Sequence, residues 1–393
     1  MKIAVLYDFG VFLGGGDFVM LNVLEALANV GYEVHLITTY PQGLNKATRF
    51  FGKSITKITL HPVKLTYKLM HPYTIALLAK IVKLYPPKHY DLYVVSDDVP
   101  LVLAGEKGVV YIHYPHVARI RLKKYISASY RSSLYGKLLW RFHEAFFPLF
   151  FVTKSIPEKW LFVANSLVTR KHVAETFNVS VDRVLLLHPP VQSKAIYNTL
   201  ISSDLEKKNL VVCVGRFEPD KRFMDVLYAF AYLKNKMQNA KLSLIGFKHG
   251  EDILRRVIVS LGLEHDVELL VNAKREVLIN RLLQAKAFIH PTPHEPFGIA
   301  VVEGMAAGAI PIVRIGINGP WLEITQRGRY GIGFNNVKEL ADAISAVLLS
   351  YESFDIKSII NRALQFDEER FRERFLSILR NFISRIASLR VRN

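Results

Sequence analysis

Two carboxylates frame a short loop in the second half of the chain, and their spacing suits a substrate that carries hydroxyl groups. Glu295 lies in the loop after an apolar run that ends at His290, and Glu303 lies in the helix predicted for residues 298–307. Glu303 comes about five residues into that helix, roughly 7 Å along its axis at about 1.5 Å per residue. Glu303 could therefore accept hydrogen bonds from a ribose diol, and Glu295 could accept them from a sugar.

The start of the same helix is suited to a diphosphate. The backbone amides of Phe297, Gly298 and Ile299 would lack partners within the helix, and the helix dipole is positive at this end. The apolar runs 287–290 and 310–313 flank the loop and helix as two strands of a βαβ unit. Such units occur in proteins of unrelated function, so solvated carboxylates on an ordinary helix remain the plain alternative.

Two cations follow another predicted strand, in the run LVVCVGRFEPDKRF. Arg216 comes directly after Gly215 at the end of the strand, and Lys221 precedes the next helix. Together they could clamp a diphosphate and neutralise its charge as it leaves. Arg222 is the alternative to Lys221 if the register differs by one residue, and an exposed surface pair is the alternative to a site.

The first half of the chain opens with a strand and a glycine-rich turn. Gly15 and Gly16 would let the backbone approach a donor phosphate or an acceptor, although a tight strand-to-helix turn would need them as well. The glycines do not fit G-x-G-x-x-G, and Thr38 and Thr39 stand where a nicotinamide site places an acid. These two departures argue against a dehydrogenase.

His113 lies at the end of the predicted strand of residues 108–114, within YIHYPH. The carboxyl end of a parallel strand faces the substrate crevice, so His113 is a candidate site residue, although a lone histidine there is often structural. Asp97 and Asp98 end the preceding strand but do not form a D-x-D motif. We read them as a loop and predict no essential metal.

Residues 117–152 combine basic and aromatic side chains with the short apolar run AFFPLFFV. This composition suits a segment that lies among lipid headgroups, and a buried helix with a solvated basic face is the alternative. The residues expected at an anionic membrane surface are Arg119, Arg121, Lys123, Lys124, Tyr125 and Trp140.

Composition limits the remaining choices. The net charge of +18 (52 basic minus 34 acidic residues) implies an anionic partner, but no zinc-finger spacing, RNP-like run or basic region with heptads points to nucleic acid. The single cysteine, Cys213, permits no intrachain disulfide, which fits a reducing cytoplasm. No signal peptide and no membrane-spanning run are expected.

The length of 393 residues suggests two or three domains. Strands alternating with helices predict an α/β fold with two Rossmann-like domains, residues 1–195 and 208–366. The polar stretch 192–209 is the expected linker between them. The helix expected at 367–393 would pack back on the first domain, as the resemblance described next implies.

The run EPFGIAVVEGMAAG, with Glu295 and Glu303 eight positions apart, resembles the E-x7-E signature of retaining glycosyltransferases of family 4. Arg216 and Lys221 match the R-x4-K pair of that family, the turn ending in Asp17 resembles its GG-x-E turn, and YIHYPH resembles a segment of the GDP-mannose-dependent mannosyltransferases. The resemblance implies the GT-B fold, with parallel sheets facing across a cleft.

The resemblance also implies roles for the residues. Arg216 and Lys221 would stabilise the leaving diphosphate, Glu295 would position the sugar, Glu303 would bind the ribose and His113 would contact the transferred sugar. The donor would be GDP-mannose or, as a second choice, a UDP-hexose. The acceptor would be a polyprenyl-linked glycan at the cytoplasmic face of a membrane. A soluble sugar acceptor and a non-catalytic nucleotide-binding subunit are the alternatives.

Overall fold

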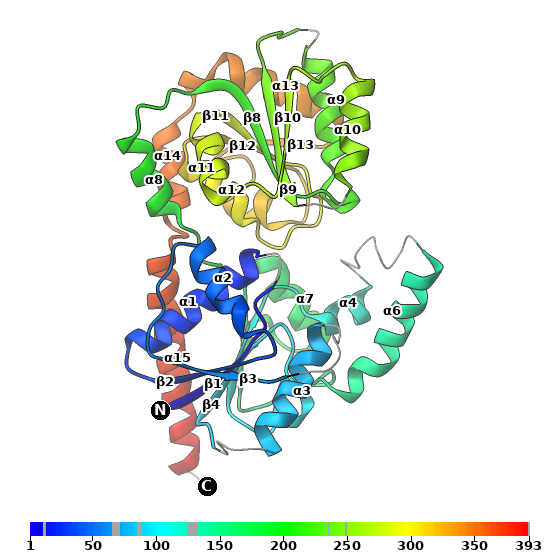
Figure 1. The fold of residues 1–393 in the computed structure, drawn as a ribbon. Helices are drawn as coiled ribbons and strands as arrows, with labels where there is room; N and C mark the ends of the chain where they lie inside the picture. The colour runs from blue at the N-terminus through cyan, green and yellow to red at the C-terminus, as the bar shows by residue number, and fades with distance from the viewer. Residues whose placement is uncertain are drawn as a thin grey trace. The chain divides into compact units, whose positions relative to one another are not determined.

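The computed structural model describes residues 1–10, 13–64, 71–84, 89–123, 133–234, 236–247 and 250–391. The chain forms two compact units, Met1–Pro190 with Glu369–Asn393, and Val191–Glu368. Figure 1 draws the first unit in blue to green with a red C-terminal helix, and the second in green to orange. The chain therefore passes between the units twice.

The first unit is built on a parallel sheet with strand order β3-β2-β1-β4-β5-β6-β7. Its strands are β1 (Lys2–Leu6), β2 (Glu33–Thr38), β3 (Ile58–Pro62), β4 (Leu92–Ser96), β5 (Gly108–Ile112), β6 (Trp160–Ala164) and β7 (Val184–Leu186). The helices are α1 (Gly15–Asn29), α2 (Pro41–Phe50), α3 (His71–Leu84), α4 (His116–Leu122), α6 (Leu134–Phe146), α7 (Leu167–Phe177) and α15 (Glu368–Val391), with short turns η1 (Leu101–Leu103), η2 (Phe147–Leu149) and η3 (Val181–Arg183).

Alternation along the central strand β1 sends side chains into two separate cores. Ile3 and Val5 pack in a cluster with α1, whereas Ala4 and Leu6 pack in a cluster with α3, and all four are fully buried. A parallel strand covered by helices on both faces has to be apolar throughout, which explains the run IAVL.

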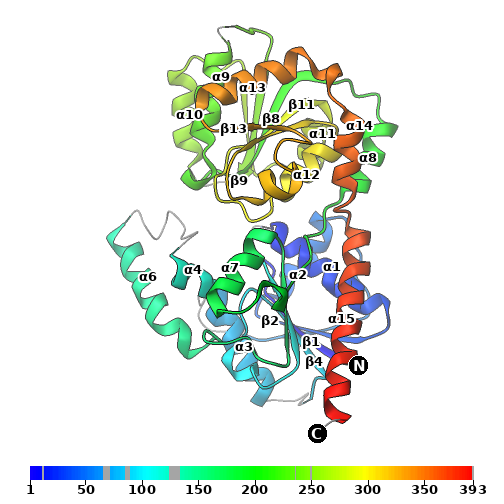
Figure 2. The same cartoon turned by 180° about the vertical axis from the view of Figure 1, so that it is seen from behind.

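The C-terminal helix α15 belongs to the first unit. Five apolar side chains three or four residues apart face the cluster around β1 and α1, which is the spacing of one helix face. They are Phe371, Phe375, Leu379, Phe382 and Ile386. Arg372 adds hydrogen bonds from its Nη1 atom to Asn22 and Glu25 of α1, at 2.7 and 3.1 Å. Figures 1 and 2 show α15 running along the first unit.

The second unit repeats the same strand order, β10-β9-β8-β11-β12-β13, again all parallel. Its strands are β8 (Lys208–Arg216), β9 (Lys241–Phe247), β10 (Val267–Val271), β11 (Ala285–His290), β12 (Ile310–Arg314) and β13 (Ile332–Phe334). The helices are α8 (Ser193–Ser202), α9 (Phe223–Lys234), α10 (Glu251–Ser260), α11 (Arg275–Gln284), α12 (Ile299–Ala306), α13 (Val337–Leu349) and α14 (Ile356–Leu364), with η4 (Pro219–Lys221), η5 (Pro320–Ile324) and η6 (Tyr351–Ser353).

The stretch expected as a linker is largely helical. Helix α8 occupies Ser193–Ser202, and it belongs to the second unit because the first unit ends at Pro190. The Asp367 carboxylate accepts hydrogen bonds from the Lys194 amide and the Ser193 hydroxyl, at 2.9 and 3.2 Å. This long-range cap fixes the first turn of α8, and the polar local sequence gave no sign of it.

Candidate active site

The functional residues predicted in the second unit gather where its strands end. Lys221 closes the η4 turn after β8, and its Nζ atom donates to Glu295 Oε2 at 2.6 Å, across 74 residues of sequence. Both side chains are about four-fifths buried. The structure therefore brings together the predicted diphosphate cation and the predicted sugar-binding carboxylate as an ion pair.

Glu295 is held ionised in spite of its burial. Burial alone would raise its pKa, but the Lys221 ammonium, and His290 after it, lower that pKa well below the usual range. His290 ends β11, is 4% exposed, and has its Nε2 atom 3.6 Å from Glu295 Oε2, which is too long for a hydrogen bond. Neither ring nitrogen has a hydrogen-bond partner among the described residues. Sequence reasoning named His290 only as the end of a strand and missed it as a site residue.

Arg216 stands apart from the Lys221–Glu295 pair. It is 57% exposed at the end of β8 and pairs with Glu218 Oε1 at 3.0 Å. The alternative residue Arg222 has a left-handed backbone, with φ of 56°, and pairs with Asp225 at 3.0 Å. Of the two neighbours, Lys221 rather than Arg222 thus contacts Glu295.

The start of α12 is shaped by a glycine. Gly298 precedes Ile299 with φ of 100°, a left-handed conformation that side chains rarely adopt. A Cβ atom added there would lie 2.9 Å from the Pro320 ring and 3.5 Å from Cγ of Glu295. Phe297 itself is 2% exposed and packs edge-on against Phe366, so its side chain belongs to the core.

The loop of residues 316–320 braces this helix start. The Gly319 amide donates to the Glu295 carbonyl at 2.9 Å. Asn318 is fully buried, donates to the Arg314 carbonyl at 3.0 Å and accepts from the Trp321 amide at 2.9 Å. These contacts hold the loop that carries Glu295 in a defined position.

Glu303 is buried on α12 and already has a cationic partner. Its side chain is 8% exposed, and Oε1 accepts a hydrogen bond from Arg275 Nη2 at 2.5 Å. Arg275 is the first residue of α11, and the same nitrogen lies 3.4 Å from Gln192 Oε1. Arg275 is a second residue that sequence reasoning missed, because 28 residues separate it from the carboxylate that it orients.

In the first unit, Asp17 organises the glycine-rich turn. Its two carboxylate oxygens accept from the amides of Gly10 and Gly14, both at 2.9 Å, and the Tyr7 hydroxyl lies 3.4 Å away. Burial raises the pKa of Asp17, and the two amides oppose that shift. Gly15 is exposed at the start of α1, and Gly16 faces inward.

His113 lies directly beside this turn. A Cβ atom on Gly16 would stand 3.4 Å from His113 Nε2, so the glycine leaves room for the ring. The Nε2 atom is buried and has no hydrogen-bond partner among the described residues. Burial lowers the pKa of His113 below its usual value, which keeps the ring neutral at pH 7.

Asp97 and Asp98 lie in the loop after β4, as expected, and they also position the YIHYPH segment. Asp97, with φ of 63°, accepts from the amides of His113 and Tyr114 at 2.8 and 2.9 Å. Asp98 accepts from the amides of His116 and Val117 at the start of α4, at 2.8 and 3.2 Å. The pair therefore fixes the backbone from His113 to Val117.

The basic segment is only partly as predicted. Arg121 and Lys123 are exposed, while Arg119 is half-buried near the Tyr114 ring. Trp140 corrects the prediction: it is 9% exposed, and its Nε1 atom donates to Glu144 at 2.6 Å, because it lies on the inward face of α6. Lys124 and Tyr125 lie outside the described residues.

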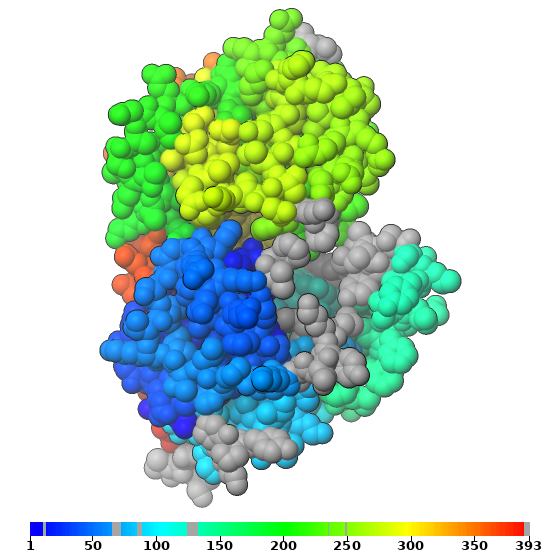
Figure 3. Space-filling view, viewed as in Figure 1, coloured from blue at the N-terminus to red at the C-terminus, as the bar shows by residue number. Residues whose placement is uncertain are grey.

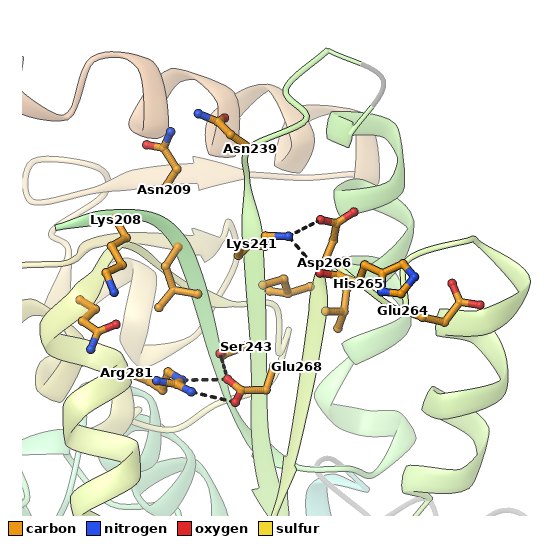
Figure 4. A pocket seen from close by; sticks show the side chains of 14 residues that line it. Lys208, Asn209, Asn239, Lys241, Ser243, Glu264, His265, Asp266, Glu268 and Arg281 are labelled. Carbon is orange, nitrogen blue, oxygen red and sulfur yellow. Dashed lines mark hydrogen bonds and ion pairs between the residues drawn. The ribbon is translucent and has the colours of Figure 1, made fainter.

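A pocket of about 610 Å³ lies at the opposite end of the second sheet, around the first residues of β8, β9 and β10 (Figure 4). Four of its charged side chains form two ion pairs. Lys241 contacts Asp266 at 2.8 Å, and Arg281 contacts Glu268 at 2.7 Å. The pocket is thus separate from the residues at the carboxyl ends of the strands.

Across the described ranges, no three His, Cys, Asp or Glu side chains come together as a potential metal site. In the same part of the chain, no helix combines the length and apolar character needed to cross a bilayer.

Comparison with known proteins supports the assignment of both units. Residues 13–194 match the family model described as Glycosyltransferase Family 4. Residues 201–359 match the one described as Glycosyl transferases group 1. The GDP-Man:Man(3)GlcNAc(2)-PP-Dol alpha-1,2-mannosyltransferase of Dictyostelium discoideum is 25% identical over 320 residues, covering 74% of this chain and 62% of the relative. The chain thus spans less than two thirds of that relative's length.

A bacterial relative and a solved structure extend the comparison. The GDP-mannose:cellobiosyl-diphosphopolyprenol alpha-mannosyltransferase of Xanthomonas oryzae is 28% identical over 154 residues, covering 38% of this chain and 40% of the relative. The structure of a glycosyltransferase from Rickettsia africae superposes with a TM-score of 0.67 at 16% identity, covering 97% and 98% of the two chains. The predicted GT-B fold is thereby confirmed, and the chain belongs to the glycosyltransferases that join a family 4 domain to a group 1 domain.

Proposed function

We propose that this protein is a retaining glycosyltransferase that moves a hexose, with mannose favoured, from a nucleotide diphosphate sugar to a polyprenyl-linked glycan. The observation that carries the proposal is the Lys221–Glu295 ion pair beside the start of α12. A cation and a carboxylate in contact, next to a helix N-terminus, offer complementary groups to a diphosphate and a sugar.

Lys221 would act on the leaving group. When the bond between the anomeric carbon and the diphosphate oxygen breaks, negative charge builds up on the diphosphate. Lys221 would neutralise part of that charge, and the exposed Arg216 could turn from Glu218 to the same phosphate. Glu295, released from part of its pairing with Lys221, would accept hydrogen bonds from the sugar hydroxyls.

Glu303 and Arg275 would serve the nucleotide. Arg275 occupies one oxygen of the Glu303 carboxylate, so the other oxygen could accept from the ribose diol. Phe297, Gly298 and Ile299 are proposed to contribute backbone amides to the diphosphate, and Gly215 lets the backbone approach it closely. A Cβ atom on Gly215 would lie 3.5 Å from the Phe223 ring and 3.7 Å from Lys221 Cγ.

The groups of the first unit would bind neutral partners. His113 is proposed to contact a sugar hydroxyl through its buried Nε2 atom, with Gly15 and Gly16 giving the ligand access. No covalent nucleophile is assigned. The new glycosidic bond would form from an acceptor hydroxyl, whose proton leaves with the departing diphosphate.

The acceptor is proposed to be a polyprenyl-linked glycan, with the protein held peripherally at the cytoplasmic face of a membrane. The two mannosyltransferase relatives are named for polyprenyl- or dolichyl-diphosphate acceptors. The positive net charge and the exposed Arg121 and Lys123 would favour an anionic leaflet.

A donor screen of the purified protein tests the proposal. GDP-mannose, UDP-glucose, UDP-N-acetylglucosamine and ADP-glucose would be supplied in turn without added metal, with and without a polyprenyl-diphosphate-linked glycan. We expect release of GDP from GDP-mannose, accelerated by the lipid-linked acceptor, and an α-linked product by NMR. A folded protein that turns over none of the donors with acceptor present would contradict the proposal and favour a nucleotide-binding subunit. Transfer to a free sugar alone would correct the acceptor class.

A further inference from the structure

Helix α6 exposes a row of large hydrophobic side chains. Leu134, Leu138, Phe142 and Phe146 are spaced four residues apart and are 86, 61, 61 and 41% exposed, and we call this row the apolar stripe. Tyr135, Leu149 and Phe150 add exposures of 71, 64 and 45% beside it. Figures 1 and 2 show α6 outside the helices that cover the first sheet, and Figure 3 shows its turquoise side chains at the edge of that unit.

The apolar stripe is not the face by which α6 joins the fold. The opposite face carries Trp140 and His143, which are buried. His143 Nδ1 lies 3.0 Å from the Tyr73 hydroxyl, and its Nε2 lies 3.3 Å from His116 Nδ1. Because these contacts fix the orientation of the helix, the apolar stripe is held outward, where a contiguous hydrophobic surface marks an interaction site.

The charges around the stripe favour one kind of partner. Lys137 and Arg141 are exposed on α6, and the only acid in that helix, Glu144, accepts the hydrogen bond from Trp140. Arg121 and Lys123 add positive charge on and just after α4. An amphipathic helix with basic residues beside Phe and Leu side chains matches the interface of an anionic bilayer. A second copy would bring a like-charged face, which is repulsive.

We propose that the apolar stripe inserts into the headgroup–acyl boundary of an anionic lipid bilayer, with Lys137 and Arg141 among the headgroups. This inference rests on the proposed function, because a polyprenyl-linked acceptor would be reached at such a surface. It replaces Trp140, one of the two aromatic residues expected at the membrane, with Phe142 and its neighbours.

Vesicle sedimentation tests the inference. Phosphatidylcholine vesicles with and without phosphatidylglycerol would be mixed with wild-type protein and with the double variant Leu138→Ser/Phe142→Ser. The matched control is Ile253→Ser/Val259→Ser on α10, where the two side chains are 52 and 59% exposed. We expect the α6 variant to lose at least about tenfold in partitioning, since membrane affinity scales with buried apolar area. The control should bind as wild type does.

Four further measurements make the outcome decisive. The charge variant Lys137→Gln/Arg141→Gln should lose the preference for phosphatidylglycerol. In the variant Phe142→Trp, brominated lipid should quench the fluorescence of the introduced tryptophan. If this variant showed no more quenching than wild type, insertion would be rejected. Light scattering that shows a dimer broken by Leu138→Ser/Phe142→Ser would overturn the proposal in favour of self-association. Donor hydrolysis by the α6 variant should be unchanged, so vesicle binding without any hydrolysis by wild type would refute only the proposed function.

Discussion

The carboxyl ends of the two parallel sheets carry different kinds of polar group. In the second unit, carboxylates meet cations, Lys221 with Glu295 and Arg275 with Glu303. In the first unit, the Asp17 and Asp97 carboxylates accept from backbone amides, and the neutral His113 keeps a buried nitrogen without a described partner. Ion pairs can be exchanged for a charged ligand, whereas a fixed neutral donor suits a hydroxyl group.

The largest effect should come from breaking the second unit's ion pair. We expect Lys221→Ala to lower donor hydrolysis by about 10² to 10³, the usual cost of one group that stabilises developing charge. Arg222→Ala is the matched control, because Arg222 is adjacent in sequence but pairs with Asp225. Rates of released nucleoside diphosphate would be measured at saturating donor. Equal losses in both variants would show that general charge, and not the Lys221 position, matters.

Replacing His113 should sharpen the contrast between the units. His113→Ala removes one hydrogen bond to an uncharged group, so we expect about a tenfold loss in transfer, at about 1.4 kcal/mol per factor of ten. Binding of the nucleoside diphosphate without sugar, followed by calorimetry, should stay unchanged, whereas Lys221→Ala should weaken it. A weaker nucleoside diphosphate complex in His113→Ala would contradict the assignment of the first unit to neutral groups.

A smaller effect should follow from loosening Glu303. Arg275→Gln leaves the carboxylate in place but removes its orienting partner, and we expect a rise of a few-fold, up to about tenfold, in the KM for donor with little change in kcat. Arg281→Gln on the same helix is the control, because Arg281 pairs with Glu268 in the pocket of Figure 4. A drop in kcat with unchanged KM would instead place Arg275 in the chemical step.

Local patterns could be predicted from the sequence, whereas contacts between distant residues could not. The predicted strand of residues 310–313 lies within β12, and the helix predicted at 298–307 is α12 (Ile299–Ala306), because apolar runs and glycine turns act locally. The two-domain α/β fold was predicted from the same local patterns and was confirmed. The partner of each charge was not predictable: Lys221 finds Glu295 across 74 residues, although both had been assigned to the ligand.

The sequence was least informative where a residue's placement depends on contacts that the local sequence pattern does not show. Trp140 lies inward because His143 and Glu144 surround it, and nothing in the local composition distinguishes it from Phe142. Asp97 was correctly predicted to lie in a loop, but the sequence did not indicate that its carboxylate accepts from two backbone amides. Helix α8 was read as a linker because its cap, Asp367, comes from the far end of the second unit.

The smallest change in activity, but an informative change in stability, should come from one buried group in each unit. Burial raises the pKa of Asp98 to about 7, and burial lowers the pKa of Lys207 to about 7. Asp98 supports the segment that carries His113. Lys207 Nζ donates to the carbonyl of Ala285 at the start of β11 at 2.9 Å, and to the carbonyl of Ala307 at the end of α12 at 2.6 Å.

The two groups should give opposite pH dependences. Folded Asp98 holds a proton that the unfolded chain loses near its ordinary pKa of 3.8, so the first unit should lose stability as pH rises from about 4 to 7. Folded Lys207 gives up its proton near pH 7, whereas the unfolded chain keeps it to 10.5, so the second unit should gain stability between about 7 and 10. Each change is at most about 5 kcal/mol, at about 1.36 kcal/mol per pH unit.

Hydrogen exchange followed by mass spectrometry would report the two units separately, through amides of β5 and β11. Asp98→Asn should reduce the change of stability with pH between about 4 and 7, in the first unit only. Lys207→Met should reduce the change of stability with pH between about 7 and 10, in the second unit only. If either variant left this pH dependence intact, the charge of that group would be compensated by water or by a neighbour. The pH response would then belong to other groups, and the difference between the two units would be confined to their sites.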